Sequence, residues 1–74
     1  MITYEEARRL ALETDPEVDR CCEWEHAWSF IAKSKMLSLS DPAVFVLKKN
    51  GEVVNGLWYR MEFPEDSVLK ETDL

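Results

Sequence analysis

The chain has 74 residues, enough for one small domain and too few for two, and 46% of them are hydrophobic. That apolar content is typical of a folded protein and excludes a disordered composition. The formal net charge is −6, with the acidic residues gathered toward both ends and a thin set of bases within residues 26–61. Nucleic-acid surfaces need clustered Lys and Arg, so this distribution disfavours nucleic acid and favours a protein partner with a basic surface.

The first predicted element is a helix that begins after Thr3. Thr3 and Glu6 have the spacing of a capping box, in which two side chains satisfy backbone N–H groups at a helix start. Apolar side chains then recur at helical spacing and form a stripe for the core, namely Tyr4, Ala7, Leu10 and Ala11. Because proline disfavours the helical conformation in the residue before it, Asp15-Pro16 is expected to end the helix.

Residues 22–32 favour a strand over a helix. As a strand they place an aromatic-rich set on one face, namely Cys22, Trp24, His26, Trp28, Phe30 and Ala32. The helical alternative begins at Asp15-Pro16-Glu17 and groups a different set, namely Cys21, Trp24, Ala27, Trp28 and Ile31. The strand is preferred because aromatic residues dominate one alternating face, and a bend near residues 25–27 is compatible with it.

A β-hairpin is predicted in the second half of the chain. The run 43–47 is apolar, Asn50-Gly51 is the two-residue signal of a type I′ turn, and residues 53–54 resume the pairing. This turn would place Lys49 opposite Glu52 as a cross-strand charge pair.

The remaining segments complete the predicted fold. Residues 34–42 are expected to form a connection, and Gly56 to mark a bulge before the apolar residues 57–59. A proline followed by two acidic residues is typical of a helix start, so residues 64–69 are expected to be helical and the tail 71–74 frayed. The whole chain is therefore predicted to be one α+β domain: an N-terminal helix packed on a small three-stranded antiparallel sheet, with a short C-terminal helix.

The sequence lacks patterns typical of a catalytic or metal site. In a strand, the single histidine, His26, lies about 13 Å from Cys22, too far for a thiol–imidazole pair. Cys21, Cys22 and His26 supply at most three soft ligands, and no second Cys/His pair completes a zinc tetrahedron. We therefore expect a protein that is not an enzyme and needs no metal or cofactor. A small enzyme or ligand carrier using Cys22 and His26 is the alternative if the segment is helical.

Aromatic and acidic side chains remain as the candidate interaction surface. Three tryptophans and two tyrosines are many for so small a core, and exposed aromatic residues are typical of protein interfaces. The candidate protein-binding residues combine both types, namely Glu23, Trp24, Glu25 and Trp58. The alternatives are that these tryptophans only fill the core, or that the chain forms a homodimer.

Targeting features are absent from the sequence. No apolar run is long enough to cross a bilayer, and no secretory signal pattern precedes the first helix. Cys21 and Cys22 are adjacent, and a vicinal disulfide closes no useful loop. These features favour a cytoplasmic protein that does not enter a membrane.

Several stretches resemble the immunity protein 35 family, small cytoplasmic bacterial proteins found alongside polymorphic toxins. The opening M-I-T-Y-E-E-A of residues 1–7 is similar to the start of that family's first helix. Trp28-Ser29-Phe30 with residues 33–35 resembles its W-x-F strand and the N/S-K segment after it. Three later stretches resemble its G-D-P loop, apolar strand and D/K-x-G-E-V hairpin, namely residues 40–42, 44–46 and 49–53. The family's A-G-N-x-P insert has no counterpart here.

The resemblance implies a protein that binds and neutralises a toxin domain by covering it with acidic and aromatic surface. It also supports a strand over residues 28–33. It transfers no functional residue, because the family has no catalytic motif to map. A second hypothesis of the same class is a phage-type inhibitor whose acidic ends mimic nucleic-acid phosphate in a basic groove.

Overall fold

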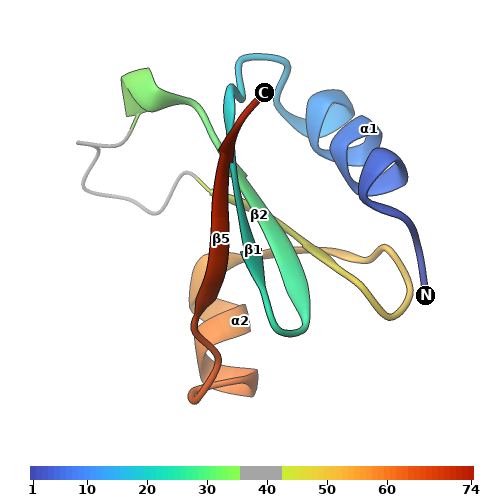
Figure 1. Ribbon diagram of the computed structural model, residues 1–74, viewed down its shortest axis with the longest axis vertical. Coiled ribbons are helices and arrows are strands. Elements are labelled where there is room, and N and C mark those ends of the chain that lie inside the picture. Colours follow the sequence, from blue (N-terminus) through green and yellow to red (C-terminus); the bar gives the residue numbers. More distant parts are fainter. Residues whose placement is uncertain (36–42) are drawn as a thin grey trace.

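The computed structural model describes residues 1–35 and 43–74, which form a five-stranded antiparallel sheet with one helix on each face (Figure 1). Its elements are α1 (Tyr4–Thr14), β1 (Arg20–Trp24), β2 (Ala27–Ile31), the 3-10 turn η1 (Lys33–Lys35), β3 (Val44–Leu47), β4 (Val53–Asn55), α2 (Gly56–Glu62) and β5 (Val68–Asp73). The strand order is β4-β3-β2-β1-β5. The first four strands therefore form a meander, and α2 carries the chain back across the sheet to β5.

Helix α1 begins and ends where the sequence predicts. The Thr3 hydroxyl oxygen accepts the Glu6 backbone N–H at 3.2 Å, which confirms the N-cap. At the other end, the Asp15 N–H donates to the Ala11 carbonyl at 2.8 Å and closes the last turn. Ala7 and Ala11 are completely buried, so the small side chains of the predicted stripe let the helix backbone approach the sheet.

The predicted strand over residues 22–32 is instead two strands, β1 and β2, joined by a turn at Glu25 and His26. The helical alternative is wrong, and the predicted bend near residues 25–27 is confirmed. The turn changes which face each ring occupies. Trp28 packs under α1, whereas Trp24 packs on the opposite face with the α2 side of the core. The continuous strand is wrong because this turn interrupts the alternation of side chains.

The predicted second hairpin is confirmed in its strands and wrong in its turn. β3 pairs with β4, but the connection has four residues, 48–51, rather than two. The Leu47 carbonyl accepts the Gly51 N–H at 2.8 Å, and the Leu47 N–H donates to the Glu52 carbonyl at 2.9 Å. Gly51 has φ +76°, the left-handed conformation that favours glycine. Leu47, and not Lys49, therefore lies opposite Glu52.

The C-terminal third departs most from the prediction. Residues 57–59, predicted as strand, belong to α2, because the Asn55 side chain caps a helix by accepting the Trp58 N–H at 2.7 Å. Residues 64–69, predicted as helix, form a turn and the start of β5. Of the tail predicted to be frayed, residues 71–73 belong to β5, which pairs with β1. The sheet therefore has five strands in the described part of the chain, and the prediction of three is wrong.

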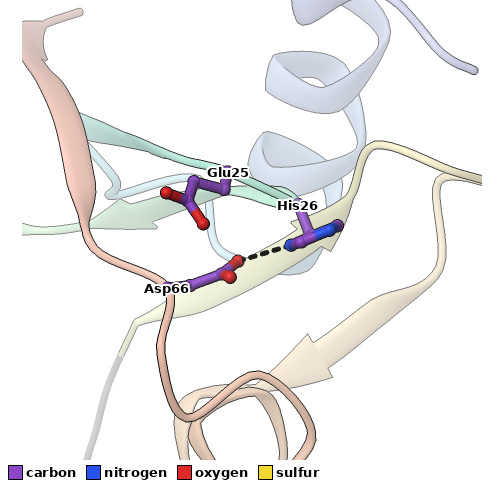
Figure 2. A group of neighbouring side chains, drawn as sticks. All are labelled: Glu25, His26 and Asp66. Atoms are coloured by element: carbon purple, nitrogen blue, oxygen red, sulfur yellow. Dashed lines mark hydrogen bonds and ion pairs between the residues drawn. The ribbon is translucent and has the colours of Figure 1, made fainter.

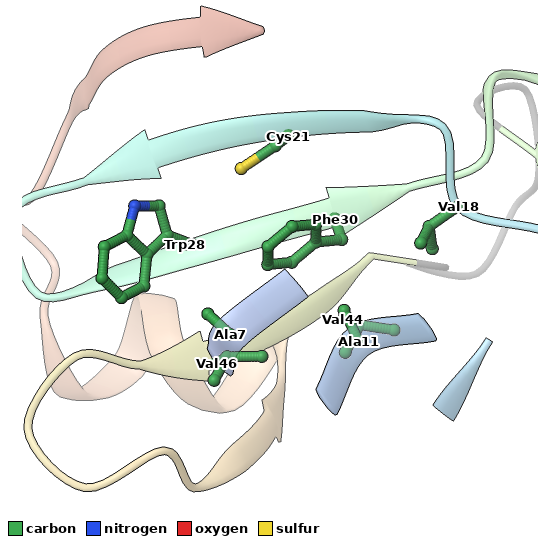
Figure 3. Close-up of a cluster of buried hydrophobic side chains, with 8 residues drawn as sticks. All are labelled: Ala7, Ala11, Val18, Cys21, Trp28, Phe30, Val44 and Val46. Carbon is green, nitrogen blue, oxygen red and sulfur yellow. The ribbon is translucent and has the colours of Figure 1, made fainter. Parts of the chain in front are cut away.

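Each face of the sheet carries a hydrophobic cluster, and alternate residues of β3 supply both clusters. The cluster beneath α1 consists of Ala7, Ala11, Val18, Cys21, Trp28, Phe30, Val44 and Val46 (Figure 3). The cluster beneath α2 consists of Ala27, Phe45, Leu47 and Tyr59, with Trp24 and Phe63 packed against it.

Within the described residues, no helix is long and apolar enough to span a bilayer. Apart from η1, the predicted connection over residues 34–42 falls outside the described residues, as does the resembling stretch 40–42.

Candidate functional site

The outer side of α2 carries three large apolar side chains, which we call the α2 patch: Leu57, Trp58 and Met61. They are 67%, 39% and 72% exposed, whereas Tyr59 of the same helix is completely buried. Leu57 and Met61 are one helical turn apart and lie on the same side of α2. Val53, at the end of β4, is also exposed and lines the same surface hollow as Trp58. The patch therefore extends from α2 onto the edge of the sheet.

Acidic residues follow the α2 patch along the chain. Glu62 ends α2, and Glu65 lies in the turn after it; both are exposed. Residues 62–74 contain five acidic residues and one basic residue. We call Glu62 and Glu65, which follow the patch along the chain, the acidic rim; α2 itself also carries the basic Arg60 in its last turn.

The four predicted binding residues do not form one surface. Trp58 belongs to the α2 patch, but Trp24 is a core residue on the inner side of α2. The Trp24 ring lies 5.5 Å from the Phe45 ring and 5.6 Å from the Tyr59 ring, measured between centroids. Its Nε1–H donates to the Ser29 hydroxyl at 2.9 Å. Trp24 therefore fills core volume, as the alternative hypothesis expected, whereas Trp58 is exposed.

The two predicted glutamates lie in different settings. Glu23 accepts from the Lys48 ammonium at 2.8 Å, and that ammonium lies 5.1 Å above the centre of the Trp28 ring. The Glu23 carboxylate thus forms an ion pair on the α1 side of the sheet. Glu25 is exposed in the β1–β2 turn, beside His26. Neither glutamate borders the α2 patch through a contact of the described residues.

A hydrogen-bonded network fixes the β1–β2 turn to the segment that follows α2. His26 Nδ1 lies 2.7 Å from Asp66 Oδ2, and Figure 2 marks this interaction with a dashed line. The Tyr59 hydroxyl donates to the same oxygen and accepts the His26 backbone N–H at 3.3 Å. The His26 ring also stacks on Phe63, with 4.6 Å between centroids and 17° between planes. The Asp66 side chain is 6% exposed and that of His26 56%, so a buried carboxylate orients an accessible imidazole.

The protonation states in this network follow from its hydrogen bonds. Burial alone would raise the pKa of Asp66, but hydrogen bonds from Tyr59 and His26 and the charge of His26 outweigh it, so this pKa lies below its usual value. Burial, followed by the hydrogen bond to Asp66, raises the pKa of Tyr59. At neutral pH the Asp66 carboxylate is therefore an acceptor and the Tyr59 hydroxyl a donor.

Glu25 completes a group that we call the turn cluster: Glu25, His26 and Asp66. One carboxylate or imidazole atom from each residue lies within 4.8 Å of the others, and the three side chains converge in Figure 2. Glu25 and His26 also line a pocket of about 480 Å³ with the apolar side chains of Leu47 and Phe63. The sequence did not predict this cluster, because Asp66 lies 40 residues from His26 and no local pattern connects them.

The two cysteines lie apart from the turn cluster. Burial, followed by the neighbouring Cys22, raises the pKa of Cys21 to about 12. The Cys22 Sγ faces the other side of the sheet and lies 3.8 Å from Glu71 Oε1. Burial and the charge of Glu71 raise the pKa of Cys22, and Arg20 offsets this only in part. Both thiols are therefore protonated at neutral pH, which does not favour a nucleophilic role.

Comparison with known proteins gives no relative from which a role can be transferred. No protein-family model matches the chain, and neither curated proteins nor solved structures include a match. The resemblance to the immunity protein 35 family stays a prediction from the sequence.

Proposed function

We propose that the protein is a non-catalytic interaction module that binds another protein through the α2 patch and its acidic rim. The observation that carries this proposal is the exposure of Leu57, Trp58 and Met61 on one short helix. Complete burial of a Leu or Met side chain contributes about 1.5–3 kcal/mol. Because about two thirds of Leu57 and Met61 is still accessible, a partner gains roughly 1–2 kcal/mol from covering each of them.

The α2 patch is held rigidly, which lowers the entropic penalty of binding. Asn55 caps the helix, and at its end the Phe63 N–H donates to the Tyr59 carbonyl at 2.8 Å. The completely buried Tyr59 ring fixes the helix on the sheet. A pre-organised surface loses little conformational freedom when a partner covers it.

The acidic rim defines the kind of partner that fits. Glu62 and Glu65 follow the apolar side chains along the chain, so a complementary surface combines an apolar area with Lys or Arg residues. Such charges mainly raise the association rate and select against acidic partners. The resemblance stated above favours a toxin domain as the partner, which the protein would neutralise by covering it.

Capture by immobilised protein tests the proposal. We expect wild-type protein to retain a specific partner from a lysate, and the variant Leu57→Ser/Met61→Ser to retain at least tenfold less. Leu74→Ser is the matched control, because Leu74 is also an exposed apolar residue and lies at the opposite end of the sheet from α2 (Figure 1). Equal capture by the double variant and the control would contradict a binding role for the α2 patch.

A second pair of variants tests the rim. Glu62→Lys/Glu65→Lys should slow association with the captured partner and reduce its salt dependence. Glu13→Lys changes charge on α1, on the other face of the sheet, and should leave association unchanged. If added nucleic acid displaces the partner, the phage-type inhibitor hypothesis is favoured over the toxin hypothesis.

A further inference from the structure

We infer that the turn cluster binds a divalent transition-metal ion such as Zn²⁺. The cluster offers one imidazole nitrogen and two carboxylate oxygens, a ligand set that suits Zn²⁺ and its neighbours in the first transition row. Its residues come from two connections, the β1–β2 turn and the segment between α2 and β5. This inference is independent of the α2 patch and of any protein partner.

The spacing of the donor atoms is close to what one ion requires. Ligands bound about 2.1 Å from Zn²⁺ in a tetrahedral site lie roughly 3.4 Å from each other. The donor atoms of Glu25, His26 and Asp66 all lie within 4.8 Å of one another. The most widely spaced pair therefore has to close by at most roughly 1.4 Å to bind one ion. Glu25 is exposed in a turn, so it is the ligand that is free to make this shift.

Asp66 is buried and hydrogen-bonded by a neighbouring side chain, as metal-binding carboxylates usually are. Its side chain is more than nine-tenths buried, and the Tyr59 hydroxyl donates to its Oδ2 atom. The Tyr59 ring is itself fixed between Phe45 and Phe63, at 4.9 and 5.1 Å. Hydrogen bonds of this kind orient ligands and strongly affect metal affinity. Tyr59 is therefore a positioning residue for the proposed site.

Charge also favours a cation at this position. Two carboxylates face one imidazole in the turn cluster. Two lysines, Lys48 and Lys49, also line the pocket. The ammonium of Lys48 binds Glu23 at 2.8 Å and so does not neutralise the cluster. Because the Asp66 carboxylate accepts hydrogen bonds, the proton between His26 Nδ1 and Asp66 Oδ2 is carried by Nδ1 in the metal-free protein. The ion replaces that proton, which moves to the exposed Nε2 atom or to solvent.

Titration with Zn²⁺ tests the inference, and the single histidine makes the readout specific. Zn²⁺ is added to chelator-treated protein while calorimetry measures binding and ¹⁵N NMR follows the His26 ring nitrogens. We expect one ion per chain with a micromolar Kd and a change at Nδ1. Tyr59→Phe should weaken binding about 10–100-fold. The absence of saturable binding below millimolar Zn²⁺, or a change confined to Nε2, would overturn the inference.

Substitutions of exposed residues test the Zn²⁺ site without disturbing the fold. Glu25→Gln leaves the hydrogen bonds among His26, Asp66 and Tyr59 in place and should weaken Zn²⁺ binding at least tenfold. Glu65→Gln is the matched control, since Glu65 is an equally exposed carboxylate one residue from Asp66, and it should bind as wild type does. Cys22→Ser should also bind normally. If Cys22→Ser abolishes binding, or if Glu25→Gln and Glu65→Gln behave alike, the ion is not held by the turn cluster.

Discussion

Removing the Tyr59 hydroxyl tests the contacts that join the β1–β2 hairpin to the C-terminal half of the chain. The hydroxyl donates to Asp66 Oδ2 and accepts the His26 backbone N–H. Tyr59→Phe keeps the ring, and hence its contacts with Trp24, Phe45 and other neighbours. The substitution therefore isolates one hydroxyl group in a completely buried position.

The expected effect on the free energy of unfolding follows from the groups left without a partner. A hydrogen bond to a charged group contributes about 1.5–3 kcal/mol. The Asp66 carboxylate loses one such bond while it stays buried, and the His26 N–H loses its acceptor. We expect Tyr59→Phe to destabilise the fold by about 2–3 kcal/mol. For a domain of this size, that lowers the midpoint of thermal unfolding by roughly 10–20 °C.

The pH dependence of this effect has a definite sign. The pKa of Asp66 in the folded protein lies below its ordinary value of 3.8. A carboxyl group with a lowered folded-state pKa stabilises the protein fully above the unfolded pKa, and this stabilisation is lost as the pH falls through the folded pKa. The difference between wild type and Tyr59→Phe should therefore be largest at neutral pH and become smaller in acid below 3.8.

Urea unfolding followed by tryptophan fluorescence provides the measurement. The midpoint should shift with little change in the slope, since the substitution alters stability rather than the surface exposed on unfolding. A loss below about 0.5 kcal/mol at neutral pH, the size of an ordinary surface substitution, would refute the hydrogen-bonding argument. A difference that increases in acid would show that the carboxylate form of Asp66 is not the acceptor.

Two further outcomes test other parts of the structure. Gly51→Ala should destabilise the protein by about 1–2 kcal/mol in urea, because φ is +76° and an added Cβ would lie 3.3 Å from Ile2. Gly51→Asn should destabilise it less, and a fully stable Ala variant would contradict the left-handed turn. Alkylation mapped by mass spectrometry should modify Cys22 before Cys21, since burial raises the pKa of Cys21 to about 12. Faster modification of Cys21 would contradict its place in the core.

The first half of the chain was largely predictable because its signals are local. The Thr3 cap and the proline after Asp15 mark both ends of α1 through interactions within a few residues. The sequence allowed a bend near residues 25–27 but did not predict a chain reversal there, because the turn uses Glu25 and His26, and among the described residues no amino acid other than glycine has a positive φ. Such a turn carries no Asn-Gly signal. Without it, the prediction placed Trp24 and Trp28 on the same face.

The C-terminal elements depend on contacts that the sequence does not display. All six residues of β5 are exposed, so this edge strand has no apolar alternation. Backbone pairing with β1 holds this strand in the sheet, together with ion pairs such as that between Arg20 and Glu71 at 2.8 Å. α2 contains the β-favouring residues Trp58 and Tyr59, and the burial of Tyr59 overrides that preference. The sequence selected Trp58, which is exposed, as a candidate binding residue. It did not indicate the His26–Asp66 pair, because the two residues lie 40 positions apart.

The α2 patch is best understood from what holds α2 in position. A helix of seven residues is too short to be stable by itself in water, so its conformation depends on contacts with the rest of the fold. Tyr59 and the Asn55 cap supply those contacts, while Leu57 and Met61 remain largely exposed and add little to the stability of the fold. Polar residues at those two positions would fold as well and would be more soluble. Two large apolar side chains on a helix that does not need them for folding are what a surface for binding another protein requires.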